Sequence, residues 1–509
     1  MNAIKTTEDK NIRIDRIINI IGCFGIAAGI LVSILMNFVN RSLWYDEAML
    51  AENFSIRSLN EILTLPPLNN QAPTIGYTFL TKLIVIIFGN SEFNLRLLSI
   101  IGFSAVCILA VIISKALDMR FYVLLGTCMA NMTYLIKYSN QVKGYISEAA
   151  CCLLCVLFFE IYRKKRDRKS LIILCCVFIA SILIANPACF VIAGLIICDM
   201  VYGALKKDKK VMLSDLIAGA SSFAVFVIYY LFWLKTCNSN EMQDIWTGQF
   251  FAFSPGNIET LIKNFEFFKI LMISADSNYL LVIVSAAGLI TAIKEKNITL
   301  CGIGLSFLIA VIASSFHLFP VSDRIWLFSY PLYMILVFYG IDIWIKYLSM
   351  KWKKIPEIVY ELLCAVVLIM VVLNGKGIKT YINPDNVYWQ GEEVNKLMDV
   401  IQENMTFNES VFVYYESAYA VKYHIGYDVD RFGKADTDNI IWSTGSAADP
   451  DNLKKDMDAI RDAGHCWIIT SHLYEAQKNW QPLYDSLVAS GDVQMYDFAG
   501  TYLFHFDVY

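Results

Sequence analysis

Long apolar runs constrain this 509-residue chain more than any other feature. A helix needs roughly 20 apolar residues to cross a bilayer, and hydrophobic residues make up 57% of the chain, against roughly 45–50% in soluble proteins. The runs lie at 17–39, 97–115, 121–137, 143–161, 170–186, 187–205, 215–234, 278–293, 298–316, 325–345 and 357–374. The sequence therefore predicts a polytopic α-helical membrane protein with about eleven spans.

The distribution of Lys and Arg predicts the orientation of these spans. Basic residues near span ends collect on the cytoplasmic side, which places "YRKKRDRK", "KKDKK", "KEK", "KWKK" and the N-terminal tail inside. A further apolar run, 72–89, carries Lys82, Gly76 and several Thr. If it crossed, "YRKKRDRK" would lie outside, so 72–89 is predicted to be an amphipathic helix at the outer interface.

This topology leaves three long parts on the outer side: the loops 40–96 and 235–277, and residues 376–509. The first run is too long for a signal peptide and no small-residue cleavage site follows it. We therefore expect a multi-pass protein of the plasma (inner) membrane with a cytoplasmic N-terminus. Its predicted domains are a transmembrane domain, 1–375, and an extracytoplasmic domain, 376–509.

The C-terminal part differs from the rest in composition, because it holds about twice as many acids as Lys and Arg. "SVFVYYE" and "HCWIITSH" are typical of short buried strands, and the last 17 residues, "VQMYDFAGTYLFHFDVY", are typical of a hairpin. Amphipathic helices are predicted at 386–405 and 449–464, the second ended by Gly464. The sequence thus predicts a small α/β domain that caps or orients an acceptor.

Composition also excludes several function classes. The net charge of −4 argues against a nucleic-acid partner, which usually requires a basic surface. The five His show no metal-ligand spacing. Most of the 14 Cys lie inside apolar runs, where they behave as small hydrophobic residues. A zinc or redox site at Cys152 and Cys155 is the weaker alternative.

One predicted membrane face gathers carboxylates, cations and aromatic side chains. "RSLWYDEAMLAENF" places Asp46 and Glu47 just beyond the first span. Other outer segments hold Arg96 in "FGNSEFNLRLLS", Tyr138 and Lys143 in "KYSNQVKGYISE", and Arg324 in "FHLFPVSDRIWLFSYP". Each has a simpler interpretation as an aromatic belt, a lipid contact, a snorkelling anchor or a helix cap. Basic residues on the outer side are nevertheless contrary to the usual collection of Lys and Arg on the cytoplasmic side. Their presence there favours a functional role.

These motifs together resemble the GT-C glycosyltransferases that use polyprenyl-phosphate sugars. The most similar are the bacterial relatives of the protein O-mannosyltransferases and of the lipid A aminoarabinose transferase. The resemblance rests on the Asp-Glu pair, "QAP" before an aromatic-rich helix, "FG-x-SEF-x-x-RL", "YS-x-Q-x-K-x-Y" and an Arg before an aromatic, Pro-containing span. It covers roughly residues 15–375, and order and spacing carry it more than any single motif.

The resemblance implies that Asp46 lies at the reaction centre. Two positions depart from the family pattern: "NQVKG" stands where some relatives carry a second acid, and Lys143 stands where an Arg is usual. These departures do not favour a two-carboxylate or metal-assisted mechanism. No cofactor and no metal site is therefore predicted, although a divalent metal is compatible with the chemistry.

Transfer from a lipid phosphate needs a carboxylate base and cations for the leaving phosphate. Asp46 is the predicted base, and Glu47 is expected to orient a cation or a sugar hydroxyl. The residues predicted to bind the donor phosphate or lipid are Tyr77, Lys82, Arg96, Tyr138, Lys143 and Arg324. The partners would be a polyprenyl-phosphate sugar (hexose or pentose), the bilayer, and an outer glycolipid, protein or envelope-glycan acceptor.

Two other function classes stay open at this point. A transporter or flippase for lipid-linked sugars would place ionisable groups or broken helices near the bilayer midplane, whereas the acids within the runs fall near their ends. A non-catalytic envelope-assembly protein would tolerate loss of Asp46.

Overall fold

A computed structural model describes residues 2–38, 42–120, 122–237, 246–252, 259–260, 262–264, 279–351, 392–406, 409–427 and 439–509. The predicted span 357–374, most of the loop 235–277 and the domain boundary at 375 lie outside these residues. Contacts divide the chain into two compact units. The helical unit comprises Met1–Ile34, Ala72–Leu80 and Leu97–Lys379; the loop–sheet unit comprises Leu35–Gln71, Thr81–Arg96 and Thr380–Tyr509.

Six helical segments in the described part of the chain are long and apolar enough to cross a membrane. They are Arg16–Phe38 within α1 (Asn2–Phe38), α5 (Glu92–Ala116), α8 (Tyr145–Lys165), α10 (Ala188–Lys206), Lys209–Cys237 and α16 (Ile298–Ser315). The segment Lys209–Cys237 joins α11 (Lys209–Tyr229), a π-helical turn (Tyr230–Leu234) and α12 (Lys235–Cys237). The polytopic helical prediction is confirmed, and the count of eleven spans stays a prediction.

Three further predicted spans also form helices. They are α9 (Arg168–Ile184), α15 (Tyr279–Glu295) and α17 (Ser329–Lys351). The run 121–137 is not one helix but two, α6 (Tyr122–Ala130) and α7 (Thr133–Ser139). At the break, the Asn131 side chain donates to the Thr127 carbonyl at 2.9 Å, so an amide side chain takes the place of a helical backbone bond.

The helix α4 (Ile75–Phe88) fills the ambiguous run 72–89. Its 14 residues rise about 21 Å, short of the roughly 30 Å hydrocarbon layer. It ends at Gly89, whose φ of +83° favours glycine. The length agrees with the prediction that this run does not cross, and its place at an interface stays a prediction.

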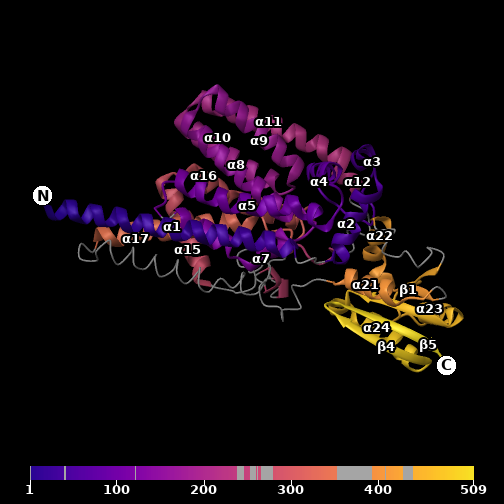
Figure 1. Ribbon diagram of the computed structural model, residues 1–509. Coiled ribbons are helices and arrows are strands. Elements are labelled where there is room, and N and C mark those ends of the chain that lie inside the picture. The colour runs from indigo at the N-terminus through magenta and orange to yellow at the C-terminus, as the bar shows by residue number, and fades with distance from the viewer. Residues whose placement is uncertain are drawn as a thin grey trace. The chain divides into compact units, whose positions relative to one another are not determined.

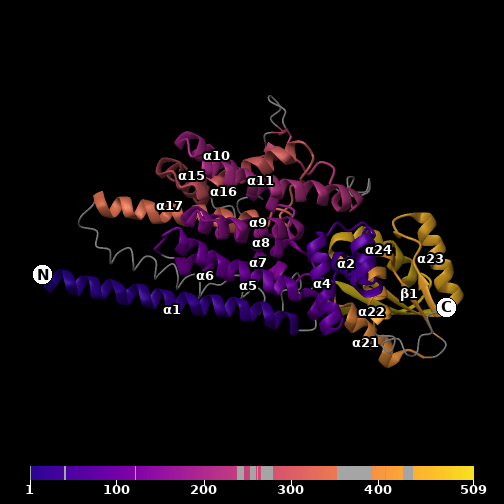
Figure 2. The ribbon, with the colours of Figure 1, turned by 90° about the horizontal axis from the view of Figure 1, so that it is seen from above.

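Small residues let the helices of the helical unit approach closely. A Cβ at Gly194 of α10 would lie 2.4 Å from the Gly302 carbonyl oxygen of α16, and one at Gly288 of α15 would lie 2.4 Å from the Leu336 carbonyl oxygen of α17. Close backbone contact is a principal source of helix association in membranes. Figures 1 and 2 show α8, α10, α11 and α16 lying side by side.

The strands described in the loop–sheet unit form one mixed sheet with the order β2-β1-β3-β5-β4. Their bounds are β1 Ser410–Val413, β2 Ile440–Trp442, β3 His465–Ser471, β4 Gly491–Phe498 and β5 Thr501–Val508. β1 pairs in parallel with β2 and β3, whereas β5 pairs antiparallel with β3 and β4. Strands β4 and β5 are the predicted terminal hairpin (Figure 1).

Alternating side chains give this sheet two apolar faces. On one face Phe412, Ile468 and Phe504 pack in a core with α23 (Pro450–Ala463) and α24 (Leu473–Val488). The other face is covered by α21 (Val394–Asn404), which packs on β3 and β5 and against α22 (Ala418–Tyr427). The predicted α/β domain is therefore confirmed, including the end of α23 at Gly464 (φ +75°). The sequence did not predict β2, α22 or α24.

The first part of the predicted outer loop, residues 42–71, belongs to this same unit. It forms α2 (Tyr45–Ile56) and α3 (Leu59–Thr64), and α2 packs against α22. The Ser42 hydroxyl donates to Asn395 Oδ1 at 2.5 Å and accepts from the Asn395 backbone N–H at 2.9 Å. A segment 353 residues away in sequence thereby holds the start of α2.

Candidate functional site

The start of α2 gives the two adjacent acids different surroundings. Trp44 is the N-cap, and its backbone N–H donates to Glu47 Oε2 at 3.3 Å. Asp46 is the second residue of the helix and is half-buried, whereas Glu47 is fully buried. Both carboxylates favour a helix N-terminus. The N-cap is therefore not Asp46, and the side chain that returns to the N-cap backbone belongs to Glu47.

Glu47 forms a two-pronged ion pair with Arg96 at the start of α5. Arg96 Nε lies 3.1 Å from Glu47 Oε1, and its Nη2 lies 3.0 Å from Oε2. Both side chains are at most 1% exposed, and Nη2 also donates to the Ser42 carbonyl at 3.1 Å. Bidentate pairing of this kind fixes geometry as well as charge. It ties α2 and the residues before it to α5.

Lys82 ties the other end of α2. Its ammonium donates to the Phe54 backbone carbonyl at 2.7 Å, and the side chain is 8% exposed. Burial lowers the pKa of Lys82, because desolvation disfavours the charged amine. Lys82 was predicted to bind the donor phosphate. One of the three N–H donors of its ammonium is instead bound to the backbone near the end of α2.

The other predicted site residues belong to the helical unit. Tyr77 is fully buried, and a Cβ at Gly144 would lie 3.5 Å from its ring. Tyr138, 4% exposed, packs edge-on against Tyr145 with ring centroids 5.6 Å apart. Lys143, which lies between Tyr138 and Tyr145 in the sequence, is 7% exposed. The turn before α8 therefore packs these aromatic and basic residues tightly.

Arg324 lies in the turn before α17. Its guanidinium stands over the Trp246 ring, 5.4 Å from the centroid, and the residue is half-buried. The neighbouring Asp323 is exposed and accepts the Arg324 backbone N–H at 2.8 Å. Asp323 and Arg324 both act electrostatically on Tyr138. The structure thus brings together Tyr138 and Arg324, two residues predicted from separate outer segments.

The predicted residues therefore form two groups, one in each compact unit. Asp46, Glu47, Lys82 and Arg96 belong to the loop–sheet unit; Tyr77, Tyr138, Lys143 and Arg324 belong to the helical unit. Within the first group, Glu47 pairs with Arg96, and Lys82 binds the Phe54 carbonyl near the end of α2.

Sequence reasoning missed a second acid beside α2. Glu392 is buried, and the Nδ1 of His472 lies 2.8 Å from its Oε1. Burial raises the pKa of Glu392, against the effects of His472 and of a hydrogen bond from the Tyr45 backbone. The His472 ring also packs against Tyr45, with centroids 5.0 Å apart. Its position at the end of "HCWIITSH" was visible in the sequence, but its acidic partner lies 80 residues away.

Among the residues that the structure describes, no group of three or more His, Cys, Asp or Glu side chains is arranged to hold a metal ion.

Comparison of the sequence finds no matching family model, and no curated protein matches it. Comparison of the fold finds ArnT from Cupriavidus metallidurans in the apo state, with 12% identity, a TM-score of 0.54, and coverage of 95% of this chain and 97% of that one. The same protein bound to undecaprenyl phosphate gives 11% identity, a TM-score of 0.52, and coverage of 95% and 97%.

An archaeal oligosaccharyltransferase has the same architecture. The protein from Archaeoglobus fulgidus, solved with zinc and sulfate, is 10% identical, with a TM-score of 0.51, over 94% of this chain and 72% of that one. ArnT, a lipid A aminoarabinose transferase, and the oligosaccharyltransferase are both GT-C enzymes. The chain therefore has the GT-C fold.

Proposed function

We propose that this chain is a multi-pass membrane glycosyltransferase. It transfers a sugar from a polyprenyl-phosphate donor to an acceptor on the outer side of the plasma membrane, with the N-terminus cytoplasmic. The observation that carries the proposal is the difference between two neighbouring acids. Glu47 is closed off by Arg96, while Asp46 stays half-buried at the start of the same helix.

Asp46 has the position and chemistry of a general base. Neighbouring residues on a helix point about 100° apart, so the pairing that buries Glu47 turns Asp46 in another direction. As the acceptor hydroxyl attacks the anomeric carbon, Asp46 takes its proton. The bond between that carbon and the phosphate oxygen breaks, and the polyprenyl phosphate leaves with the electron pair.

The cations divide between two tasks in this proposal. Arg96 and Lys82 already bind Glu47 and the Phe54 carbonyl, so we assign Glu47, Arg96 and Lys82 to positioning α2. Arg324 is half-buried and lies on an aromatic ring. We assign it to the leaving phosphate, which needs positive charge and not a general acid.

Tyr77, Tyr138 and Lys143 are assigned to the same phosphate or to the lipid next to it. An ArnT structure with this fold holds undecaprenyl phosphate, which supports a polyprenyl phosphate as the lipid part of the donor. The sugar, hexose or pentose, and the acceptor are left open by these residues.

Asp46→Asn tests the proposal directly. It keeps the shape of the side chain but removes the base, so transfer from a synthetic polyprenyl-phosphate sugar should fall by about 10²- to 10⁴-fold. Donor binding and thermal stability should match the native protein. Glu52→Gln, an acid later on the same helix, is the matched control and should keep its transfer rate.

Two results would count against this function. Full transfer by Asp46→Asn would remove the assigned base. Movement of the labelled donor across a liposome membrane without transfer to any acceptor would instead indicate a flippase.

A further inference from the structure

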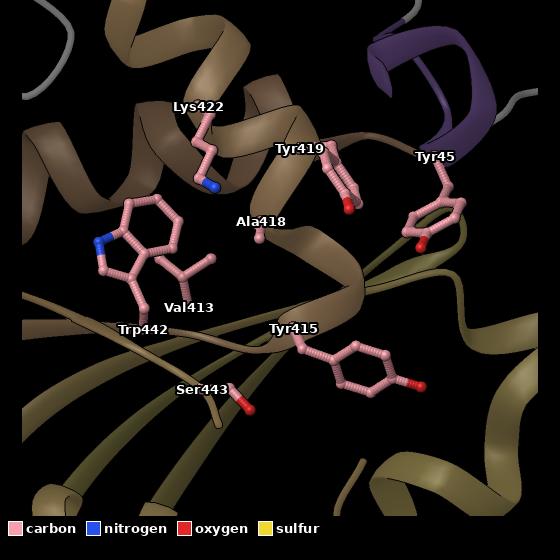
Figure 3. Close-up of a pocket in the computed structure, with 8 residues that line it drawn as sticks. All are labelled: Tyr45, Val413, Tyr415, Ala418, Tyr419, Lys422, Trp442 and Ser443. Atoms are coloured by element: carbon pink, nitrogen blue, oxygen red, sulfur yellow. The ribbon is translucent and has the colours of Figure 1, made fainter. Parts of the chain in front are cut away.

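A cleft opens at the carboxyl ends of β1 and β2 in the loop–sheet unit. It encloses about 360 Å³, toward the lower end of the roughly 300–1,000 Å³ range of ligand pockets. Val413 and Tyr415 border it from the end of β1, and Trp442 and Ser443 from the end of β2 (Figure 3).

The strand connections explain why the cleft forms here. β1 leads into α22, which packs with α21, whereas the neighbouring parallel strand β2 leads into α23 in the core on the other face. Two adjacent strands that leave toward opposite faces open a crevice between their carboxyl ends. Ligands of open α/β sheets bind in crevices of this kind.

The walls of the cleft are mainly aromatic. Tyr419 of α22 and Tyr45 of α2 line one side, with ring centroids 5.4 Å apart and nearly perpendicular. Trp442 lies on the edge strand and is 40% exposed. Figure 3 shows Trp442, Tyr415 and Tyr419 around Ala418, which leaves room between the rings.

Lys422 supplies the positive charge of the cleft. Its ammonium lies 5.3 Å from the Trp442 ring centroid and 5.9 Å from that of Tyr419. Within the described residues it forms no ion pair. An ammonium on a flexible stem can leave such a ring to meet an anion.

The acids near the cleft are bound by other groups. Glu416 accepts from the Tyr415 hydroxyl at 2.7 Å and from Asn479 at 3.2 Å. Asp456 accepts from the Ser443 hydroxyl at 2.6 Å. Burial, followed by the nearby Tyr419 and acids, raises the pKa of Tyr45 to about 12, so its hydroxyl stays neutral. The cleft therefore offers aromatic faces, neutral hydroxyls and one ammonium.

We propose that this cleft binds one pyranose unit of the acceptor, a unit that carries an acidic group such as a carboxylate or phosphate. The C–H face of the sugar ring packs against Trp442 and the Tyr rings, its hydroxyls meet the hydroxyls of the cleft, and its acidic group meets Lys422. This inference rests on the proposed function for the identification of the ligand as the acceptor; the binding itself does not depend on transfer.

Saturation-transfer NMR on the full-length protein in detergent tests this binding. The probes are glucuronic acid, glucose 6-phosphate, glucose and inorganic phosphate. The two acidic sugars should bind more tightly than glucose or phosphate alone. Trp442→Ala should weaken both by about 2- to 10-fold through the loss of aromatic packing.

Lys422→Gln should remove the preference for the acidic sugars, which is expected to be up to about fivefold for an exposed charge pair. Lys455→Gln, on an exposed position of α23, is the matched control and should bind as the native protein does. Lys422 is exposed, so Lys422→Gln should fold normally. It therefore tests the inference even if Trp442→Ala fails to fold.

Three results would overturn the inference: equal binding of glucose and the acidic sugars, native binding by Trp442→Ala, or displacement of the sugar by an acidic peptide. Asp46→Asn separates this inference from the proposed function. It should lose transfer yet bind acidic sugars normally. A protein that transfers sugar but does not bind the acidic sugars would contradict only the proposed binding in the cleft. A protein that binds them normally but transfers no sugar would contradict only the proposed glycosyltransferase function.

Discussion

The two compact units hold their predicted phosphate-binding cations in different ways. In the loop–sheet unit, Arg96 is fully buried against Glu47 and the Ser42 carbonyl. In the helical unit, Arg324 is half-buried and stands on the face of Trp246. An Arg buried in a bidentate pair fixes a fold, whereas a half-buried Arg on a ring can still meet a ligand. The same residue type is thus buried in an ion pair in one unit and partly exposed over an aromatic ring in the other.

Arg96→Met should produce the largest effect on stability. It leaves the Glu47 carboxylate buried without its guanidinium, and breaking a buried pair costs about 3–5 kcal/mol. We expect a corresponding loss in the free energy of unfolding, measured by thermal and denaturant unfolding in detergent.

The double variant Glu47→Leu, Arg96→Met is the control for this first prediction. Replacing a whole buried pair with apolar groups is often neutral, so the double variant should recover most of the lost stability. Native stability in Arg96→Met alone would mean that the pair does not hold α2, and Arg96 would return as a candidate phosphate ligand.

Arg324→Ala should have the second-largest effect, and on binding instead of stability. Loss of one charge-assisted contact to a phosphate costs about 1.5–3 kcal/mol, or roughly 10- to 150-fold in donor affinity. Donor binding is measured with a synthetic polyprenyl-phosphate sugar, alongside thermal stability. Arg324→Lys keeps the charge without the fork and should recover part of the affinity. Unchanged affinity in Arg324→Ala would make this residue a membrane anchor.

Local patterns in the sequence were enough to predict much of the fold. Apolar length indicated the membrane helices, and period-two alternation indicated the terminal hairpin. The glycine after "DPDNLKKDMDAIRDA" indicated where α23 ends. The break between α6 and α7 was missed because polar residues such as Asn131 are few in this apolar run, and the effect of Asn131 comes from one side-chain bond.

Long-range pairing could not be read from the sequence. The Glu47–Arg96 pair spans 49 residues, and both residue types fit a solvated outer loop equally well. Predicting the cleft beside Trp442 requires knowledge of the strand order in the sheet. The sequence does not reveal that order, because β2 has only three residues. A strand this short, between segments without clear periodicity, gives no reliable pattern.

The smallest expected effect concerns two of the acid–histidine pairs of the loop–sheet unit, Glu392–His472 and Glu409–His505, which should respond oppositely to pH. Burial raises the pKa of Glu392 above its ordinary value of 4.5, beside His472, Glu47 and the Tyr45 backbone. Burial also acts on Glu409, but hydrogen bonds from Thr406, His505 and Trp467 outweigh it and lower that pKa. The stability contributions of the two acids therefore change with pH in opposite directions.

The signs follow from which state binds the proton. Above about pH 4.5 the unfolded chain has lost the Glu392 proton while the folded chain keeps it, so this contribution is lost as pH rises through the raised pKa. The Glu409 contribution is present above its unfolded pKa and is lost as pH falls through the lowered one. Thermal unfolding is measured from about pH 2 to about pH 8. Glu392→Gln should remove the loss of stability above about pH 4.5, and Glu409→Gln should remove the loss below about pH 4.5. The exposed His465–Asp507 pair, whose hydrogen bond raises the pKa of His465, titrates equally in both variants, so each difference profile isolates one acid. If the Glu392→Gln profile followed that of the native protein, the buried acid beside α2 would carry no shifted proton, and only its hydrogen bonds would hold the helix that presents Asp46.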